Sequence, residues 1–365
     1  MSEVIFTHAL TDDLEAYCLR QALPKKLVLC VDKYIDTHFG VALNLELRKK
    51  NFTAHKSVIP ASERSKSLAM ANKLYGEWLA AGVDRSYLVV AIGGGVVGDL
   101  AGFVAASYMR GLRLIHVPTT LLAMVDSAIG GKVAINHHAG KNLIGFFYDA
   151  ELTLIDTTFL RSLPEREMYS GLAEVLKYAL IGDEKFLAFL EKHFAEILAQ
   201  RPPLLTAIKK SVAAKQHIVK QDFKETKGLR ATLNFGHTFA HALEKLAHYK
   251  YLRHGEAVLW GMLCASALSQ RIGKITAEDL SRIAQMIARF KIKEPIAKAY
   301  FLNQTEAQIV SAMQADKKKQ NGKLRFVLLD KIGQAFLSDE QIEMHEVCRA
   351  IKDAKALWKD ASKVQ

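Results

Sequence analysis

The chain has 365 residues, half of them hydrophobic, which is enough for two domains with cores of their own and excludes a mainly disordered protein. The longest apolar runs, such as Tyr87–Ile92, have the length of a strand, so we expect no membrane span. The formal net charge is +12, but the basic residues are dispersed and lack the basic and aromatic pattern of a nucleic-acid binder. We therefore expect an anionic small molecule as the ligand, with neither nucleic acid nor membrane as a partner.

Cysteine usage and the first residues of the chain indicate the compartment. The four cysteines, Cys18, Cys30, Cys264 and Cys348, have no paired spacing and are typical of reduced thiols. The stretch up to Tyr17 contains acidic residues and no basic region, so it does not resemble a secretory signal. We expect a cytoplasmic protein.

Short apolar strands alternate with helical stretches in the first part of the chain. This rhythm predicts an α/β domain with a Rossmann-like parallel sheet covered by helices on both faces. The expected elements, in order, are strand Lys26–Val31, helix Ser65–Ala81, strand Tyr87–Ile92, helix Val97–Met109, strand Leu112–Val117 and strand Leu152–Ile155.

The pattern changes near residue 163. Amphipathic segments of helix length dominate up to Gln314, and strand signals vanish. Near the end, Leu324–Leu329 and Gln334–Leu337 predict a small hairpin, followed by a helix over Asp339–Trp358. We therefore expect two domains, an α/β domain over residues 1–163 and a mostly α-helical domain over residues 164–365.

A glycine-rich turn follows the strand Tyr87–Ile92 and opens the next helix. Gly93, Gly95 and Gly98 fit the pattern G-x-G-x-x-G, in which bare backbone approaches a pyrophosphate at a helix N-terminus. The motif follows a later strand than in the standard fold, and no acidic residue lies about twenty positions further on to bind a ribose. A tight structural turn is the alternative. We interpret the segment as a phosphate-approach loop of a variant fold, with Asp32 as the candidate ribose ligand.

Four residues of the helical part offer ligands for a divalent metal ion: Glu174, His237, His241 and His254. His237 and His241 are four residues apart, so on a helix both imidazoles leave the same face. Three protein ligands would leave a position open for substrate or water, as in catalytic zinc sites. The alternative is a set of ordinary core and surface side chains.

Further polar residues surround these candidates. Glu174 and Lys177 are three apart and share a helix face, where a surface salt bridge is the alternative to a functional pair. A second group of four polar residues would form one polar stripe if a single helix carried all of them. The stripe would lack the Lys and Glu that are typical of a solvated helix face, which favours a functional role for these residues. This group is Arg230, Asn234, His237 and His241.

Several long motifs occur in a fixed order and cover nearly the whole chain. They are Gly93–Gly111, Val117–Asn142, Leu163–Tyr178, Gly228–Glu244 and His254–Val258. In these motifs the chain resembles the 3-dehydroquinate synthases of the sugar-phosphate cyclase superfamily. The resemblance implies a lyase that converts 3-deoxy-D-arabino-heptulosonate 7-phosphate into 3-dehydroquinate and phosphate. The implied route is transient oxidation by NAD, β-elimination of phosphate, re-reduction and intramolecular aldol closure.

The resemblance also implies roles for individual residues. Glu174, His237 and His254 would bind Zn²⁺ or Co²⁺, while Arg110 would reach the phosphate in the neighbouring subunit of a homodimer. The implied substrate residues are Asp126, Lys132, Asn142, Lys177, Lys215, Arg230, Asn234 and His241, with one lysine from the run Asp316–Lys319. The implied NAD residues are Asp32, Glu63, Lys66, Gly94, Gly95, Asp99, Thr119, Thr120, Lys132, Lys141, Phe159 and Ser162.

Some positions depart from the family's pattern. Pro60–Glu63 reads Pro-Ala-Ser-Glu where Pro-Asp-Gly-Glu is common, and Asp32 is followed by Lys33 rather than by a small polar residue. The stretch between Lys215 and Arg230 is one residue longer than usual. Two other enzymes remain as alternatives: another sugar-phosphate cyclase, and a metal-dependent polyol dehydrogenase, whose neutral substrate needs no such set of cations.

Overall fold

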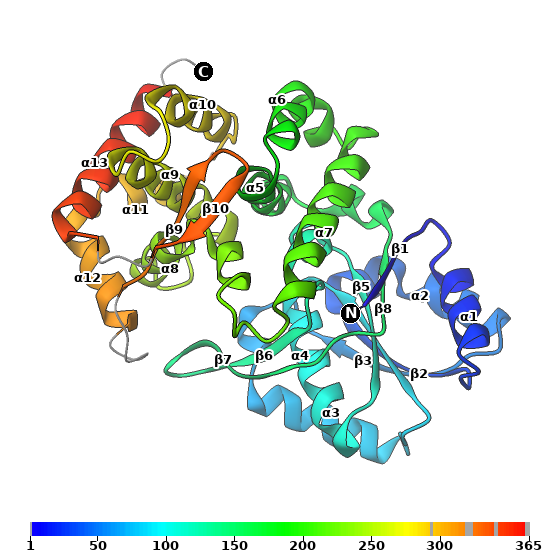
Figure 1. Cartoon of the computed structure of the whole chain (residues 1–365). Helices are drawn as coiled ribbons and strands as arrows, with labels where there is room; N and C mark the ends of the chain where they lie inside the picture. The colour runs from blue at the N-terminus through cyan, green and yellow to red at the C-terminus, as the bar shows by residue number, and fades with distance from the viewer. Residues whose placement is uncertain (1, 293–294, 318–323, 339–341, 362–365) are drawn as a thin grey trace. The chain divides into compact units, whose positions relative to one another are not determined.

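The protein, described here from a computed structural model, divides into two compact units, Met1–Leu163 and Pro164–Gln365 (Figure 1). The structure describes residues 2–292, 295–317, 324–338 and 342–361.

A six-stranded sheet in which every neighbouring pair is parallel forms the centre of the first unit. The strands β4 and β8 are buried along their whole length, and β2 and β5 nearly so, which requires cover on both faces of the sheet. This confirms the predicted parallel sheet. In spatial order the strands are β1 (Glu3–Phe6), β8 (Leu152–Ile155), β5 (Arg113–Pro118), β4 (Leu88–Gly93), β2 (Lys26–Asp32) and β3 (Thr53–Ile59).

The elements of this unit that were not predicted include β1, β3 and the helices α1 (Leu10–Arg20) and α2 (Lys33–Lys49). The helix α2 has no clear apolar stripe because Val41 and Leu45 lie on its exposed side. The strand β3 lies at the sheet edge and buries only part of its length, so polar residues interrupt its apolar run. The remaining elements are η1 (Glu63–Ser65), α3 (Leu68–Ala80), α4 (Gly95–Ser107), η2 (Tyr108–Arg110), η3 (Ala123–Ser127) and η4 (Thr157–Ser162).

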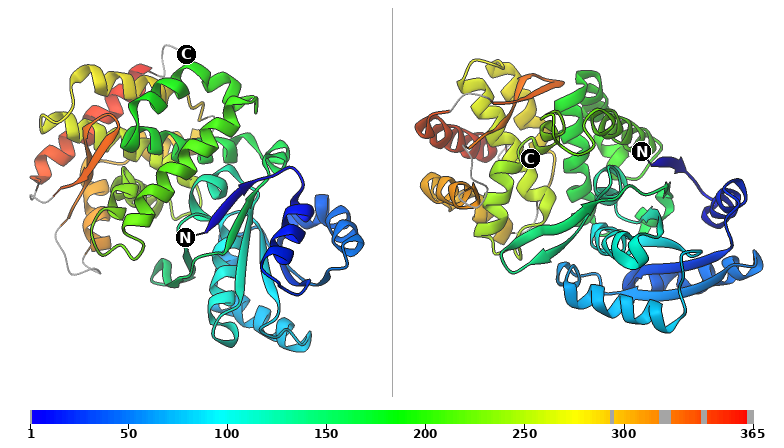
Figure 2. Two further views of the ribbon diagram at one scale, coloured as in Figure 1. Left: turned by 45° about the vertical axis from the view of Figure 1, so that its right-hand side comes forward. Right: turned by 60° about the horizontal axis from the view of Figure 1, so that its bottom comes forward.

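A second, two-stranded ribbon follows η3. The strands β6 (Lys132–His137) and β7 (Gly140–Phe147) pair antiparallel, and Figure 2 shows them as a long hairpin. The sequence analysis expected no strands between Leu112–Val117 and Leu152–Ile155, because glycines and polar residues at a hairpin resemble a loop in sequence. The hairpin packs on α4, where a Cβ atom on Gly102 would lie 2.3 Å from Val133 Cγ1. Glycine at this position therefore permits the close approach of helix and hairpin.

The second unit is mainly helical, as predicted, with two buried helices at its centre. All residues of α5 (Glu165–Gly182) from Met168 to Ile181 are buried, and so are those of α9 (His254–Arg271) from Gly255 to Ser269. The other helical elements are α6 (Glu184–Leu198), α7 (Pro203–Gln221), η5 (Arg230–Asn234), α8 (His237–Leu246), α10 (Ala277–Ala288), α11 (Pro295–Leu302), α12 (Glu306–Lys317) and α13 (Met344–Ala361).

The predicted C-terminal hairpin is present, with small shifts of its bounds. The strands β9 (Val327–Lys331) and β10 (Gln334–Leu337) pair antiparallel around Gly333, whose φ is +87°. The final helix begins at Met344, later than expected, and residues 339–341 lie outside the described part of the chain.

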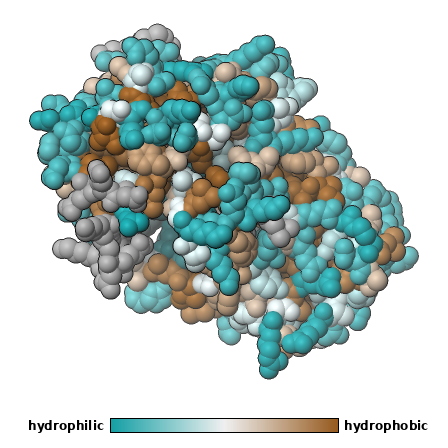
Figure 3. Space-filling model, viewed as in Figure 1, coloured by the Kyte–Doolittle hydropathy of each residue, from teal (hydrophilic) through white to brown (hydrophobic). Residues whose placement is uncertain are grey.

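Hydrophilic residues dominate the face of the molecule in Figure 3, with smaller hydrophobic areas among them. Within the described ranges, no helix has the length and apolar character that a bilayer crossing demands.

Candidate active site

Three of the predicted metal ligands converge in the second unit. The candidate ligand atoms of Glu174, His237 and His254 all lie within 4.8 Å of one another. His254 Nε2 is 3.3 Å and His237 Nε2 is 3.6 Å from Glu174 Oε1. Two imidazoles and one carboxylate form a donor set that suits Zn²⁺ or a similar ion and leaves coordination positions open.

Close packing of two helices brings His254 to Glu174. A Cβ atom on Gly255 would lie 2.4 Å from the backbone of Ser170, so only glycine allows the start of α9 to approach α5 this closely. Gly255 N–H also donates to Ser170 Oγ at 3.0 Å. Arg166 on α5 forms a two-pronged ion pair with Glu256 on α9, at 2.6 and 2.8 Å. These contacts fix the first turn of α9, which carries His254.

A turn between η5 and α8 sets the orientation of the His237 side chain. Gly236 adopts a left-handed conformation with φ of +78°, and its carbonyl lies against Gly261 of α9. The polar stripe therefore does not follow one helix, as the spacing suggested, because η5 ends at Asn234 and α8 begins at His237. The rings of His237 and His241 still meet edge to face, with centroids 5.5 Å apart.

Two charged neighbours act on the metal cluster. Lys177 forms an ion pair with Glu174, as their spacing predicted, and both side chains are buried. Glu244 of α8, which the sequence did not single out, places Oε1 3.6 Å from His254 Nδ1. Burial lowers the pKa of His254, but hydrogen bonds to Glu174 and Glu244 outweigh it and raise the pKa to about 10. Burial lowers the pKa of His237 to about 3.

The remaining predicted substrate residues of this unit differ in exposure. Lys215 on α7 and Arg230 on η5 are buried, whereas Asn234 and His241 are exposed. Arg230 donates from its guanidinium to the carbonyl of Phe223. The run Asp316–Lys319 cannot be placed, since Lys318 and Lys319, like the side chains of the residues before them, lie outside the described part.

Asp222, which the sequence analysis did not identify, holds the loop before Arg230. Its carboxylate accepts from the backbone N–H groups of Thr226, Lys227 and Arg230, at 2.8, 3.0 and 3.0 Å. Burial raises its pKa, but these hydrogen bonds outweigh burial, so the pKa lies below its ordinary value. The sequence signal that could have identified Asp222 is its position four to eight residues before these amides, which is typical of an aspartate that closes a loop by capping backbone N–H groups.

In the first unit, the glycine-rich turn brings bare backbone to the N-terminus of α4. Gly94 caps this helix, and its carbonyl accepts from Val97 and Gly98, each at 3.1 Å. A Cβ atom on Gly94 would lie 3.1 Å from Thr120, and one on Gly95 would lie 3.0 Å from Ser127. Side chains at these two positions would crowd the turn. Glycine avoids the crowding and leaves the N–H groups of the turn accessible to an anion.

The other predicted nucleotide residues lie at the carboxyl ends of the strands. Asp32 ends β2 and caps α2, with Oδ1 accepting from Tyr34 N–H at 2.8 Å. Thr119 and Thr120 follow β5, and Thr120 Oγ1 accepts from Ala123 N–H at 3.1 Å. Further along, Phe159 is buried and Ser162 Oγ donates to its carbonyl at 3.2 Å. Ligands of parallel sheets bind at this edge.

A chain of polar contacts joins three further predicted residues of this unit. The buried Lys66 donates to Asp99 Oδ2 and to Asn142 Oδ1, so one ammonium joins η1, α4 and β7. Glu63 is exposed, and its carboxylate lies 3.9 Å from the same ammonium. The residues predicted to hold nucleotide and substrate thus form a bonded cluster within this unit.

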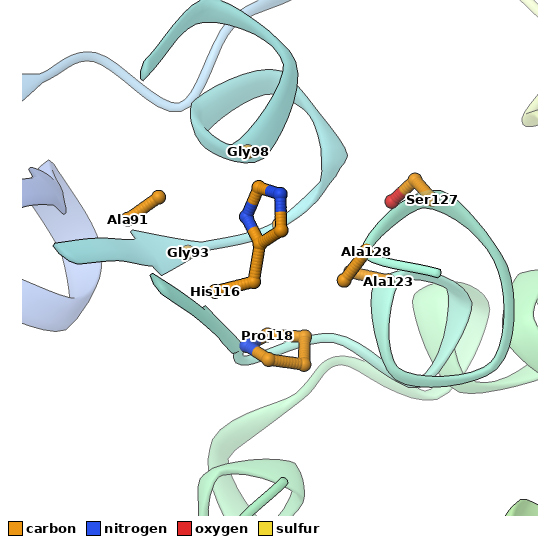
Figure 4. Close-up of a pocket in the computed structure, with 9 residues that line it drawn as sticks. Ala91, Gly93, Gly98, His116, Pro118, Ala123, Ser127 and Ala128 are labelled. Atoms are coloured by element: carbon orange, nitrogen blue, oxygen red, sulfur yellow. The ribbon is translucent and has the colours of Figure 1, made fainter. Parts of the chain in front are cut away.

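A small cavity lies beneath the glycine-rich turn. Its lining includes Gly93, Gly98 and Ser127, and the imidazole of His116 points into it, as Figure 4 shows. Burial lowers the pKa of His116 to about 4, so the ring is neutral at pH 7. The strand Leu112–Val117 was predicted, but no motif indicated a role for this histidine.

The last predicted residues of the first unit are more exposed. Lys132 lies on β6 with Nζ 6.0 Å from the ring of Phe147, and Lys141 lies on β7. Asp126 is part of η3 and is half-buried. Arg110 is exposed, with a left-handed φ of +70° that is uncommon for a residue other than glycine.

Comparison with known proteins decides the family. Residues 56–170 match the family "3-dehydroquinate synthase N-terminal", and residues 171–319 match "3-dehydroquinate synthase C-terminal". The 3-dehydroquinate synthase of Chlorobium chlorochromatii (strain CaD3) is 51% identical over 360 residues, covering 98% of this chain and 99% of that protein. The chain belongs to the 3-dehydroquinate synthase family.

Solved structures of related cyclases share the fold of this 3-dehydroquinate synthase family member. The 2-epi-5-epi-valiolone synthase from Streptomyces hygroscopicus subsp. jinggangensis 5008, with NAD⁺ and Zn²⁺ bound, is 28% identical, with a TM-score of 0.85 over 98% of this chain and 97% of that one. A 2-deoxy-scyllo-inosose synthase complexed with carbaglucose-6-phosphate, NAD⁺ and Co²⁺ is 27% identical, with a TM-score of 0.81 over 96% of each chain.

Proposed function

We propose that this protein catalyses the 3-dehydroquinate synthase reaction. The substrate is 3-deoxy-D-arabino-heptulosonate 7-phosphate, and the products are 3-dehydroquinate and phosphate. The observation that carries the proposal is the convergence of Glu174, His237 and His254, with Lys177 beside them, in a chain about half identical to 3-dehydroquinate synthases.

The donor set of the second unit fits a divalent ion, either Zn²⁺ or Co²⁺. Glu174, His237 and His254 would hold it, and the buried carboxylate of Glu174 would offset part of its charge. When bound, the ion and NAD⁺ supply a Lewis acid and a hydride acceptor for the oxidation that precedes loss of phosphate.

The chain's own residues bind and orient the anionic groups of the substrate. In the second unit, Lys177, Lys215 and Arg230 are buried cations, and cations with little water around them attract a carboxylate or phosphate strongly. Asn234 and His241 add exposed groups that can donate to phosphate oxygens. In the first unit, Asp126, Lys132 and Asn142 are the proposed substrate contacts.

NAD is proposed to bind at the carboxyl edge of the parallel sheet in the first unit. The turn at Gly94 and Gly95 and the N-terminus of α4 suit its pyrophosphate, because free N–H groups and the helix dipole favour an anion. Asp32 is the proposed ribose ligand. The other proposed contacts are Glu63, Lys66, Asp99, Thr119, Thr120, Lys132, Lys141, Phe159 and Ser162.

The proposal includes a cytoplasmic homodimer in which Arg110 serves the active site of the neighbouring subunit. The two consecutive left-handed residues Met109 and Arg110 support a special role, since such strained conformations gather at functional sites. Arg85 holds this turn by donating to the carbonyl of Met109 at 2.9 and 3.1 Å.

Mixing two inactive variants tests the role of Arg110. Arg110→Ala and His254→Ala would each be inactive alone, and refolding them together would restore partial activity because one site of each heterodimer is then intact. No recovery from a mixture that forms heterodimers would contradict a contribution across the subunits.

The main experiment measures phosphate release from the heptulosonate substrate by protein loaded with Zn²⁺ or Co²⁺, with NAD⁺ present. We expect catalytic release without net accumulation of NADH, since the hydride returns to the substrate. Net NADH formation from a neutral polyol would indicate a polyol dehydrogenase, and turnover of only a different sugar phosphate would indicate another cyclase. Metal-loaded protein without phosphate release would refute the proposal.

A further inference from the structure

Asn136 on β6 lies between two groups of proposed site residues, although no motif identified it. The hairpin register pairs Ile135 with Ile144 and His137 with Gly140, and it gives Asn136 no partner on β7. Between these two pairs β6 has one residue, Asn136, whereas β7 has three, Lys141 to Leu143, so β7 bulges opposite Asn136. Such bulges redirect side chains and occur next to active sites.

The side chain of Asn136 forms hydrogen bonds with two different segments of the first unit. Its Oδ1 accepts from the backbone N–H of Asn142 at 2.9 Å, and its Nδ2 donates to Glu63 Oε1 at 2.7 Å. The backbone joins the same link, because Asn136 N–H donates to the carbonyl of Lys66 at 2.8 Å. The orientation of the amide is fixed at both ends, since Asn142 N–H can only donate and a carboxylate can only accept.

These bonds determine how Asn142 is presented. Asn142 has a left-handed φ of +56°, and its backbone N–H is held by Asn136 rather than by the ladder of the hairpin. Its Oδ1 accepts from Lys66, which can only donate. The Nδ2 donors of Asn142 make no hydrogen bond within the described structure, so they are available to a ligand.

We propose that Asn136 is a positioning residue that couples the nucleotide segment Glu63–Lys66 to the substrate residue Asn142. The inference rests on the proposed function, which assigns Glu63 and Lys66 to NAD and Asn142 to the substrate. NAD⁺ that orders Glu63 and Lys66 also orders Asn142 through Asn136, and binding of either ligand then favours the other by the same factor.

The experiment measures this coupling directly on the full, metal-loaded protein. The probe is a phosphonate analogue of the substrate, in which carbon replaces the bridging oxygen so that phosphate cannot leave. We expect NAD⁺ to tighten its binding about tenfold in the parent protein, within the usual range for coupled sites, and by a factor close to one in Asn136→Ala. Amide hydrogen exchange of Gly140–Phe147 should slow on addition of NAD⁺ in the parent and change less in the variant.

A donor and acceptor swap separates coupling from general damage. Asn136→Asp keeps an acceptor for Asn142 N–H but places a carboxylate opposite Glu63, so coupling is lost. Adding Glu63→Gln to it supplies a donor from the other side, so the coupling factor should recover relative to Asn136→Asp alone. His138→Ala in the same hairpin is the matched control, because its ring is exposed and lies against that of His137, with centroids 3.8 Å apart. It should retain the parent's coupling.

The outcomes are distinguishable. A parent protein that does not bind NAD⁺ would refute the proposed function and this inference with it. Binding of both ligands with the same coupling factor in the parent and in Asn136→Asp would refute the inference alone. If Asn136→Ala fails to fold, the coupling can still be measured with Asn136→Asp, because this substitution preserves the size of the side chain.

Discussion

The two units prepare their binding groups in different ways. In the second unit, helix packing brings Glu174, His237 and His254 together with their ligand atoms within 4.8 Å, and the carboxylate is fully buried. In the first unit, Lys66 and Asp99 are already bonded to each other and, through Lys66, to Asn142. One cluster gathers ligand atoms that suit a cation, whereas the members of the other are joined to one another by hydrogen bonds.

This difference sets how each cluster responds to change. Removing one ligand from the metal cluster leaves too few donors to hold a catalytic ion, so the effect is close to all-or-none. Removing one member of the bonded cluster leaves the others able to form new contacts, so the effect is graded. Equal losses on removal of one side chain from either cluster would contradict this contrast.

The largest effect is expected for His254→Ala. Two remaining ligands hold an ion poorly, so most bound metal is lost, and phosphate release falls on the order of 10³-fold because the Lewis acid is absent. Metal analysis and the phosphate-release assay on the same preparation check this. His345→Ala, on the exposed surface of α13, is the control and should keep both. Full metal content in His254→Ala would refute this triad.

A smaller effect is expected for Glu244→Gln. Glu244 faces His254 Nδ1, and a carboxylate there would hold the ring with Nε2 toward Glu174, the orientation in which His254 would bind a metal ion. Loss of such a partner weakens metal affinity about 10- to 100-fold. Competition with a chromogenic chelator measures the affinity independently of activity. Glu278→Gln on the exposed side of α10 is the control, and an unchanged affinity in Glu244→Gln would show that packing alone orients His254.

In the first unit, Lys66→Met removes the ammonium but keeps an apolar side chain of similar length. The buried Asp99 loses its partner, so unfolding by urea should show a loss of about 3 kcal/mol in stability, the lower range for a broken buried pair. NAD⁺ affinity should fall as well. Adding Asp99→Asn removes the charge that has lost its ammonium partner and should restore part of the stability but not the affinity. Equal stability of the single and double variants would mean that the pair does not act as a unit.

Much of the fold could be predicted because burial leaves a plain pattern. The strand Tyr87–Ile92 reads as a continuous apolar run since both of its faces are covered, and β4 occupies it almost residue for residue. The strand β3 and the helix α2 were missed because polar residues at a sheet edge and apolar residues on an exposed face obscure the period. The hairpin β6–β7 was missed because the bulge of β7 opposite Asn136 interrupts the alternation.

The metal cluster shows what spacing can and cannot supply. Spacing paired Glu174 with Lys177 correctly, because both lie on one helix. It also paired His237 with His241, whereas the structure completes the group with His254 from another helix. That contact depends on Gly255 meeting Ser170, a close approach between helices that no period along one helix encodes. The residues alone offered His254 as one of four candidates, and only the family resemblance chose it over His241 as the third ligand.

The last prediction concerns the buried His116 of the first unit, whose effect appears only at acidic pH. Burial lowers its pKa from 6.5 to about 4, so the unfolded chain takes up a proton below pH 6.5 while the folded protein does not. Its contribution to stability is therefore intact above pH 6.5 and is lost as the pH falls toward 4, by about 3 kcal/mol in total. His116→Gln, which does not titrate, should flatten the decline of unfolding free energy across this range, whereas His345→Gln should not. Urea unfolding at several pH values measures the slope. Identical slopes for the parent and His116→Gln would mean that water reaches the ring and that the cavity beneath the glycine-rich turn accommodates its charge.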